Sequence, residues 1–283
     1  MRMSLLTNSL TGVGVTDLKA IAGWAAANDI HELDVGPAIA MDRQVFEDVL
    51  GEGKVEIKTM IYCRNFLSED EEEARQHQEA LKERIRFAGT VGIEKIVCST
   101  GVTKDAFAGT CFVPEKSADA CVELAKEFLE EAEKNNVRLC WENCPMMGNI
   151  ATSPDMWQML FDRLDSDRIG LCYDPSHLVW QMIDPYGNIF KFKDKIFHMH
   201  AKDTHVDYEK LSLYGTQQNA KWWCHRLPGL GDLDWNRIVD ALYQIGYDKA
   251  ICIEHEDPVW DGTEEKVKRG ILKTRDHVSQ FFM

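Results

Sequence analysis

The stretch IGLCYDPSH, residues 169–177, ends an apolar run with Asp174 and His177. Three other apolar runs in the second half of the chain also end in side chains that can bind metal ions. They are LCWEN at 139–143 with Glu142, FHMHAKD at 197–203 with His200, and AICIEHED at 250–257 with Glu254. The runs are rich in Ile, Leu, Cys and aromatic residues, as buried strands are. The candidate ligands therefore share one place, the C-terminal end of successive strands.

Short apolar runs alternate with longer amphipathic stretches along the whole chain, which predicts a parallel sheet with right-handed crossovers. Strands are expected at 3–8, 30–35, 55–61, 94–99, 137–142, 169–174, 195–201 and 249–254. Helices are expected at 15–27, 43–50, 69–91, 117–135, 153–163, 186–193, 235–245 and 263–281. The alternation predicts one (β/α)₈ TIM barrel domain over residues 1–283, with its active site at the C-terminal face of the strands.

Composition and charge narrow the classes of partner. No run approaches the roughly 18 apolar residues of a membrane span, and residues 1–10 lack the apolar region of a signal peptide. We therefore expect a soluble, cytoplasmic protein with no membrane partner. The formal net charge of −15 repels phosphates and argues against a nucleic-acid partner. A small neutral or weakly charged substrate is favoured.

The predicted ligands are Glu142, Asp174, His200 and Glu254, from four neighbouring strands. A single carboxylate at a strand end is more often a helix cap or a loop acceptor. Several converging carboxylates, however, would repel one another without a cation. Three carboxylates and one imidazole suit one divalent ion such as Mn²⁺, Mg²⁺, Co²⁺ or Zn²⁺. Glu256 has the same strand parity as Glu254 and stays open as the fourth ligand.

Residues close to these ligands are candidates for binding substrate. His177 is expected to approach the metal, bond a substrate hydroxyl or cap the next helix, and it is the alternative catalytic acid/base to Glu142 and Glu254. Lys202 offers charge to an oxyanion, and Asp203 is a candidate acceptor that orients a ligand. His198 lies one layer deeper, where it supports the site or packs in the core.

Two further groups of candidates lie away from the ligands. Glu32 and Asp34 end the second predicted strand and are expected to bond substrate hydroxyls or loop amides. A long loop after the seventh strand carries KWWCHRLPGLGDLDW at 221–235. Its Trp222, Trp223 and Arg226 are expected to shape a substrate wall, although Trp222 and Trp223 are equally suited to anchoring a lid.

Several motifs occur in an order and spacing that resemble the xylose isomerase-like TIM-barrel superfamily, in particular its sugar phosphate isomerase/epimerase group. They are WEN at 141–143, YDPSH at 173–177, HMHAKD at 198–203, PGLGDLDW at 228–235 and IEHED at 253–257. The resemblance to ketose 3-epimerases implies one divalent ion, most often Mn²⁺, on Glu142, Asp174, His200 and Glu254. It also implies that Glu142 and Glu254 act as an acid/base pair, and that His177 and Arg226 contact the sugar.

Departures from the epimerase pattern keep other reactions open. Ketose epimerases carry a second glutamate where this chain reads CPMMGN, with Met146 and Met147, which disfavours a simple ketohexose. Zinc AP endonucleases of the superfamily add histidines after strands 3 and 4. This chain has YCRNF and CSTGV at those places. Other members dehydrate inososes or dehydroshikimate, or eliminate aglycones from 3-oxo-glycosides.

The resemblance therefore implies a divalent-metal-dependent sugar isomerase or epimerase. It would act on a keto-sugar or related polyol through a metal-stabilised enediolate. The alternative is a metal-dependent lyase on the same scaffold, and an AP-endonuclease-like hydrolase is less favoured. A small-molecule carbohydrate is the expected partner, and a homo-oligomer stays open.

Overall fold

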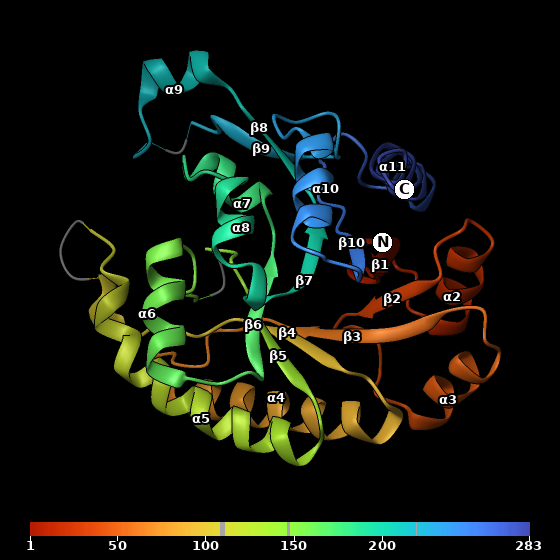
Figure 1. Cartoon of the computed structure of the whole chain (residues 1–283), viewed down its shortest axis with the longest axis horizontal. Helices are drawn as coiled ribbons and strands as arrows, with labels where there is room; N and C mark the ends of the chain where they lie inside the picture. The colour runs from red at the N-terminus through yellow and green to blue at the C-terminus, as the bar shows by residue number, and fades with distance from the viewer. Residues whose placement is uncertain (108–110, 146–147, 219) are drawn as a thin grey trace.

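A closed barrel of parallel strands, in the order β1-β10-β7-β6-β5-β4-β3-β2, forms the centre of the computed structural model (Figure 1). The structure describes residues 1–107, 111–145, 148–218 and 220–283. The barrel strands are β1 (Arg2–Leu6), β2 (Glu32–Val35), β3 (Glu56–Tyr62), β4 (Lys95–Cys98), β5 (Arg138–Glu142), β6 (Ile169–Tyr173), β7 (Ile196–Ala201) and β10 (Ala250–Ile253). The predicted (β/α)₈ architecture is confirmed.

Helices surround the barrel, and Figure 1 shows α4 and α5 side by side beneath the strands. The helices are α1 (Asn8–Thr11), α2 (Leu18–Ala26), α3 (Arg43–Gly51), α4 (Glu71–Val91), α5 (Ala118–Lys134), α6 (Pro154–Leu164), α7 (Ser176–Trp180), α8 (Gly187–Lys191), α9 (Tyr208–Tyr214), α10 (Trp235–Gln244) and α11 (Glu264–Ser279). Aspartates begin several of them: Asp17, Asp42, Asp70 and Asp234 accept hydrogen bonds from free backbone N–H groups at the starts of α2, α3, α4 and α10. Within the described ranges, no helix is both long and apolar enough to cross a membrane.

The inside of the barrel is filled by one small apolar cluster. Its buried members are Leu6, Ile61, Val97, Cys140, Cys172, Phe197 and Cys252. A second, larger cluster lies between the outer faces of the strands and the helices. Alternate strand residues supply the two clusters, because successive side chains of a strand point to opposite faces. The barrel is therefore a packed core, and its function has to reside at its ends.

The connection after β7 is not the plain long loop that the sequence suggested. It forms an antiparallel ribbon of β8 (Asp203–Val206) and β9 (Trp223–Arg226), in which Asp203 pairs with Arg226 and Val206 with Trp223. Figure 1 shows this β8–β9 ribbon and α9 standing above the barrel. The ribbon gives positions 223–226 a strand geometry, so neighbouring side chains there point in opposite directions.

The buried carboxylate of Asp203 holds the return from this ribbon to α10. It accepts hydrogen bonds from the backbone N–H groups of Thr204 at 2.8 Å and Leu233 at 3.1 Å, and from Trp235 Nε1 at 3.1 Å. A Cβ at Gly231 would lie 2.2 Å from Asp203 Oδ1, so only glycine fits beside the carboxylate. Asp203 therefore organises the loop, and the prediction that it orients a metal ligand is wrong.

We expect Asp203→Ala to lower the free energy of unfolding by more than about 2 kcal/mol, because each buried donor left without a partner costs about 1–3 kcal/mol. Urea unfolding of the metal-free protein measures this. The matched control is Asp240→Ala on α10, whose exposed carboxylate accepts a hydrogen bond from Gln244; it should change stability by less than about 0.5 kcal/mol. Equal stabilities of the two variants would contradict the role given to Asp203.

Candidate metal centre at the barrel mouth

The four predicted ligands meet at the C-terminal end of the barrel. Ligand atoms of Glu142, Asp174, His200 and Glu254 all lie within 4.8 Å of one another. They come from the ends of β5, β6, β7 and β10, which are neighbours in the barrel. The hydrogen-bonded register of the strands sets the height of these residues in the barrel. Glu142 pairs with Cys172, two residues before Asp174, and His200 pairs with Cys252, two residues before Glu254. Strand order and parity thus suffice to bring the four side chains together.

The imidazole of His200 lies between two of the carboxylates. Its Nδ1 is 3.2 Å from Glu142 Oε1 and 3.0 Å from Glu254 Oε2. The side chains of His200 and Asp174 are completely buried, and that of Glu254 is 11% exposed. Asp174 also shapes the start of α7, since its Oδ1 accepts a hydrogen bond from the backbone N–H of Ser176 at 2.8 Å. One of its oxygens is therefore fixed by the backbone, and the other faces the cluster.

Lys202 was expected to offer charge to an oxyanion, and its positive charge lies among the carboxylates of the cluster. Its buried Nζ lies 2.8 Å from Glu254 Oε2, 3.1 Å from Asp174 Oδ2 and 3.0 Å from Glu256 Oε2. Burial would raise the pKa of Glu254, but Lys202 and His200 hold it well below its usual range. Burial raises the pKa of Asp174 to about 6 even though Lys202 lies beside it. Without a metal ion, the three carboxylates therefore share the positive charges of Lys202 and His200.

The residues present fit a divalent cation. Asp174 Oδ2 and both ring nitrogens of His177 are buried, and none has a hydrogen-bond partner among the described atoms. His177 Nε2 lies 3.3 Å from Asp174 Oδ2 and 4.0 Å from Glu142 Oε1. Burial and the charges of Lys202 and His225 hold the pKa of His177 well below its usual value, so its imidazole is neutral. His177 does not cap α7.

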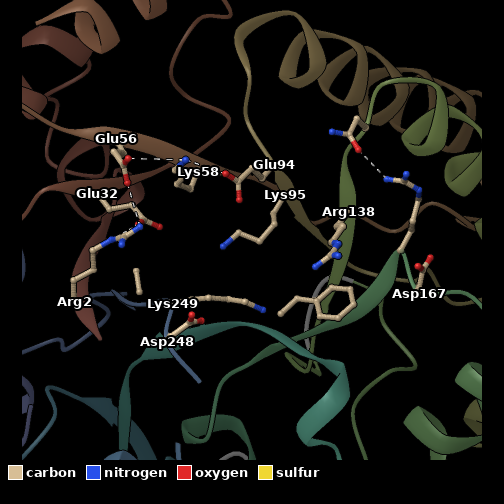
Figure 2. Close-up of a pocket in the computed structure, with 14 residues that line it drawn as sticks. Arg2, Glu32, Glu56, Lys58, Glu94, Lys95, Arg138, Asp167, Asp248 and Lys249 are labelled. Atoms are coloured by element: carbon tan, nitrogen blue, oxygen red, sulfur yellow. Dashed lines mark hydrogen bonds and ion pairs between the residues drawn. The ribbon is translucent and has the colours of Figure 1, made fainter. Parts of the chain in front are cut away.

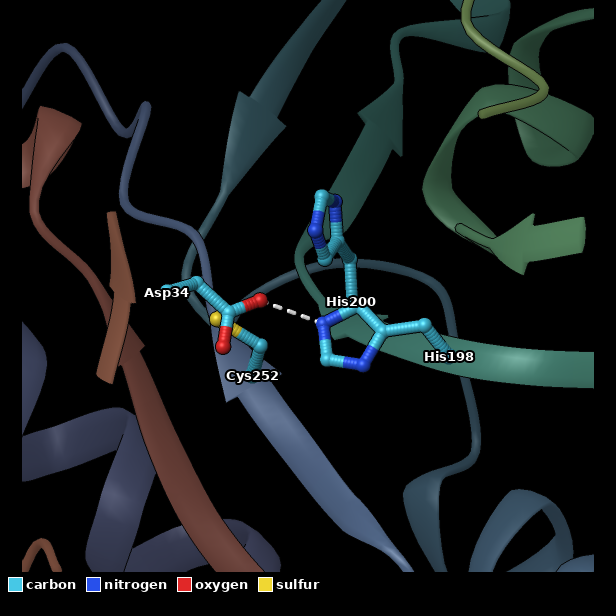
Figure 3. Close-up of side chains that lie close together, drawn as sticks. All are labelled: Asp34, His198, His200 and Cys252. Carbon is cyan, nitrogen blue, oxygen red and sulfur yellow. Dashed lines mark hydrogen bonds and ion pairs between the residues drawn. The ribbon is translucent and has the colours of Figure 1, made fainter. Parts of the chain in front are cut away.

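A second buried group supports the cluster from below (Figure 3). His198 Nε2 contacts Asp34 Oδ2, and Ser4 Oγ donates a hydrogen bond to Asp34 Oδ1 at 2.6 Å. The rings of His198 and His200 meet edge to face, with centroids 5.5 Å apart. Asp34 therefore anchors His198, and His198 restrains the ring of His200. The prediction that Asp34 bonds substrate hydroxyls or loop amides is wrong, since the side chain points into the barrel.

Glu32 lies at the other end of the barrel. It is the first residue of β2, pairs with Ser4 in β1, and accepts a hydrogen bond from Arg2 Nε at 2.7 Å. The strand was expected over 30–35, which placed Glu32 too near the strand's C-terminal end. The prediction that Glu32 binds substrate at the mouth is therefore wrong.

Two residues in or directly beside the β8–β9 ribbon lie away from the places predicted for them. Arg226 Nε donates to Asp257 Oδ2 at 2.8 Å, and the buried Asp257 also accepts from the backbone of Leu227 at 3.0 Å. Arg226 thus ties the ribbon to the loop after β10 and does not line the mouth. Trp222 is buried at 6% exposure and lines a cavity outside the mouth. The predicted substrate wall of Arg226 and Trp222 is therefore wrong.

The cavity at the mouth has a volume of about 130 Å³, and it includes residues that sequence reasoning missed. Arg64, after β3, supplies the cation that Arg226 was expected to bring, and His225 points in from β9. The ring of His225 lies 5.3 Å from that of His177 and 5.0 Å from that of Trp223. Trp223 stacks in turn on Trp180 at 4.5 Å, so a row of rings leads outward from the cluster.

The position of Met146 and Met147 lies outside the described residues. The segments YCRNF and CSTGV, at the ends of β3 and β4, contain no histidine, although a trinuclear zinc site would require histidines there.

Comparison with known proteins gives one family. The family model for the xylose isomerase-like TIM barrel matches residues 29–277. An inosose dehydratase of Clostridium perfringens is 24% identical over 254 residues, covering 84% of this chain and 80% of the relative. The uncharacterized protein y4fM of Sinorhizobium fredii is 25% identical, covering 65% of this chain. That alignment spans only 54% of y4fM, and alignment to an inosose dehydratase of Lacticaseibacillus casei spans 35% of that protein at 32% identity.

Solved structures share the fold. The IolI protein with a bound zinc atom has a TM-score of 0.76 at 18% identity, covering 100% of this chain and 99% of that one. D-psicose 3-epimerase with D-tagatose, from Clostridium cellulolyticum H10, has a TM-score of 0.74 at 14% identity, with 99% of both chains covered. The barrel, its strand-end acids and the family match agree, and the chain belongs to the xylose isomerase-like TIM-barrel family.

Proposed function

We propose that this chain is a divalent-metal-dependent sugar isomerase or epimerase acting on a keto-sugar or related polyol. The observation that carries the proposal is the convergence of Glu142, Asp174, His200 and Glu254 within 4.8 Å at the barrel mouth. The similarity to inosose dehydratases and to the fold of D-psicose 3-epimerase supports a small carbohydrate substrate. The activities named for these relatives belong to them, and the reaction assigned to this chain is our proposal.

One divalent ion would be held by the four converging side chains. The oxygen-rich donor set favours Mn²⁺, and the imidazole also allows Zn²⁺, Co²⁺ or Mg²⁺. The IolI structure, which has a zinc atom, supports a metal on this scaffold. When bound, the ion would act as a Lewis acid on a substrate carbonyl and make the neighbouring C–H more acidic. Charge balance supports this, because with His200 neutral as a ligand Lys202 brings one positive charge to three carboxylates.

Glu142 and Glu254 are the proposed acid/base pair. They come from β5 and β10 and approach His200 Nδ1 at 3.2 and 3.0 Å. Lys202 keeps Glu254 ionised, which suits it to accept a proton from carbon. Glu142, which takes part in this step in its protonated form, then delivers its proton from its own side of the mouth and is left as the carboxylate. Delivery to the opposite face of the planar intermediate inverts the carbon, which is epimerisation.

His177, Lys202 and Arg64 are the proposed substrate-binding residues of the mouth cavity. The neutral imidazole of His177 has both ring nitrogens without partners in the described part of the chain, so it can donate to one substrate oxygen and accept from another. Lys202 and Arg64 offer charge to oxygens that become negative during the reaction. Arg226 and Trp222 are not among the proposed substrate-binding residues, because their contacts are structural.

A lyase is the second candidate, and the position of His177 favours it. His177 Nε2 lies within 4.0 Å of both Glu142 and Asp174, so one side of the mouth carries a neutral acid/base group beside a carboxylate. Such a group can donate a hydrogen bond to a departing β-hydroxyl, which leaves as water with the proton that Glu254 removes from carbon. The printed activity of the inosose dehydratase relatives agrees with this alternative. The nuclease alternative lacks its additional histidines in the sequence.

We expect Mn²⁺-loaded protein in D₂O to introduce deuterium at the carbon next to the carbonyl of its substrate. The panel consists of keto-hexoses, keto-pentoses, inososes and 3-oxo-glycosides, followed by proton NMR. An epimer labelled at one carbon supports the leading candidate, and an unsaturated product supports the lyase. Product formation without any exchange or elimination at that carbon would contradict proton abstraction as the shared step.

Glu142→Gln should lower the rate of this exchange at least about 100-fold, the usual contribution of a positioned acid/base group. The free energy of unfolding should stay the same or rise in the metal-free protein, because the substitution removes a charge from a group of mutually repelling carboxylates. The two readouts are NMR exchange and urea unfolding. A variant that unfolds even with metal supplied would make Glu142 a structural residue.

Metal binding distinguishes the two glutamates after β10. Glu254→Gln should weaken Mn²⁺ binding by at least about tenfold, since it removes a proposed ligand. Glu256→Gln is the matched control: its side chain is 49% exposed and lies outside the cluster, so metal affinity should hardly change. Elemental analysis of the unmodified protein should find about one ion per chain, by the mononuclear donor count. Three tightly held zinc ions would contradict this site.

A further inference from the structure

A cavity of about 630 Å³ opens at the N-terminal end of the barrel, away from the candidate metal centre (Figure 2). The packed apolar cluster inside the barrel separates the two ends. Charged side chains line this cavity, because most barrel strands begin with, or directly after, a basic residue. Those that line the cavity are Arg2 in β1, Lys95 in β4, Arg138 in β5, Arg168 before β6 and Lys249 before β10.

The carboxylates on one wall of the cavity already have cations. Arg2 Nη2 lies 2.6 Å from Glu32 and 3.1 Å from Glu56, the first residues of β2 and β3. Lys58 Nζ lies 2.9 Å from Glu94 on the same wall. The two remaining acids that line the cavity, Asp167 and Asp248, are exposed to solvent at its rim. Water screens such rim charges, so they compensate little of the charge inside.

Three cations on the other wall have no such partner. Among the described residues, Lys95, Arg138 and Lys249 make no ion pair within 4.0 Å. Figure 2 shows their side chains directed into the same open space. Lys95 is only 6% exposed, and an unpaired buried ammonium is costly unless an anion accompanies it. The free-energy cost of burying the Lys95 ammonium without a partner indicates that an anionic ligand binds beside it.

The three charges are close enough to repel one another. Burial lowers the pKa of Lys249, and the charges of Lys95 and Arg138 lower it further. The ring of Phe197 forms the floor between them, 5.2 Å from the guanidinium carbon of Arg138 and 5.5 Å from Lys249 Nζ. A rigid aromatic floor with one guanidinium and two ammonium groups around it matches a tetrahedral oxyanion, which takes several charged donors at once.

We propose that Lys95, Arg138 and Lys249 form a binding site for a phosphate group, either free or carried by a small phosphorylated molecule. The site is independent of the proposed metal chemistry at the other end of the barrel. Arg138 donates two N–H groups to two phosphate oxygens, and the lysines neutralise the remaining charge. The formal net charge of the chain is −15, so these cations are a local exception and not part of a general basic surface.

Isothermal titration calorimetry of the full chain, treated with EDTA to remove metal from the other mouth, tests the proposal. Inorganic phosphate and pyrophosphate probe the free anion, and glycerol 3-phosphate probes an ester; the tighter of these identifies the source. Lys95→Met and Lys249→Met should each weaken binding at least about tenfold, the loss of one charge-assisted hydrogen bond. Lys249 is half-buried at the cavity edge, so Lys249→Met should fold even if Lys95→Met does not. Phosphate binding can then still be tested with Lys249→Met.

The matched control is Lys19→Met, which removes one exposed lysine paired with Asp48 on the surface. It should change phosphate affinity by less than about twofold, since exposed charges are screened. Absence of saturable binding, or binding that Lys249→Met leaves unchanged, would overturn the proposal. An equal loss in Lys19→Met would also overturn it, because the effect would then come from net charge alone.

Discussion

Mutual repulsion among Glu142, Asp174 and Glu254 is the constraint on which the rest of this barrel mouth depends. Three carboxylates that lie within 4.8 Å of one imidazole cannot all stay ionised in a buried place without cations. Lys202 supplies one charge, and its three contacts to Asp174, Glu254 and Glu256 show how strongly the site attracts cations. Asp34 and His198 hold the imidazole of His200 from below, so it stays between the carboxylates of Glu142 and Glu254. A divalent ion is the partner that such a rigid acidic site can accept.

The convergence of the four proposed ligands was predictable because it depends only on strand period and strand order. Glu142, Asp174, His200 and Glu254 each follow an apolar run, and parallel strands place all such positions at one end. The same reasoning gave the wrong place for Glu32. The segment IHELDV at 30–35 is short and does not show at which end of β2 the glutamate lies. Hydrogen-bonded register, which pairs Glu32 with Ser4 and Glu56, decides that point, and register is a tertiary property.

Side chains on the ribbon after β7 could not be assigned from sequence for a different reason. Pairing of β8 with β9 sets which of Trp222, Trp223 and His225 turn toward the mouth, and pairing partners are not visible in a single chain's pattern. The alternation across WCHR at 223–226 was the one available signal, and it would have favoured Trp223 and His225 sharing a face. Arg226 then falls on the other face, where the buried Asp257 takes its charge.

Strand polarity also explains why the two ends of one barrel have opposite character. All strands run the same way, so residues that begin strands gather at one mouth and residues that end them gather at the other. In this chain Arg2, Lys95, Arg138 and Lys249 stand at strand starts, while Glu142, Asp174 and Glu254 stand at strand ends. Basic strand starts and acidic strand ends, repeated along the sequence, therefore form an anion-attracting mouth at one end and a cation-attracting mouth at the other. The packed interior between them separates the two mouths.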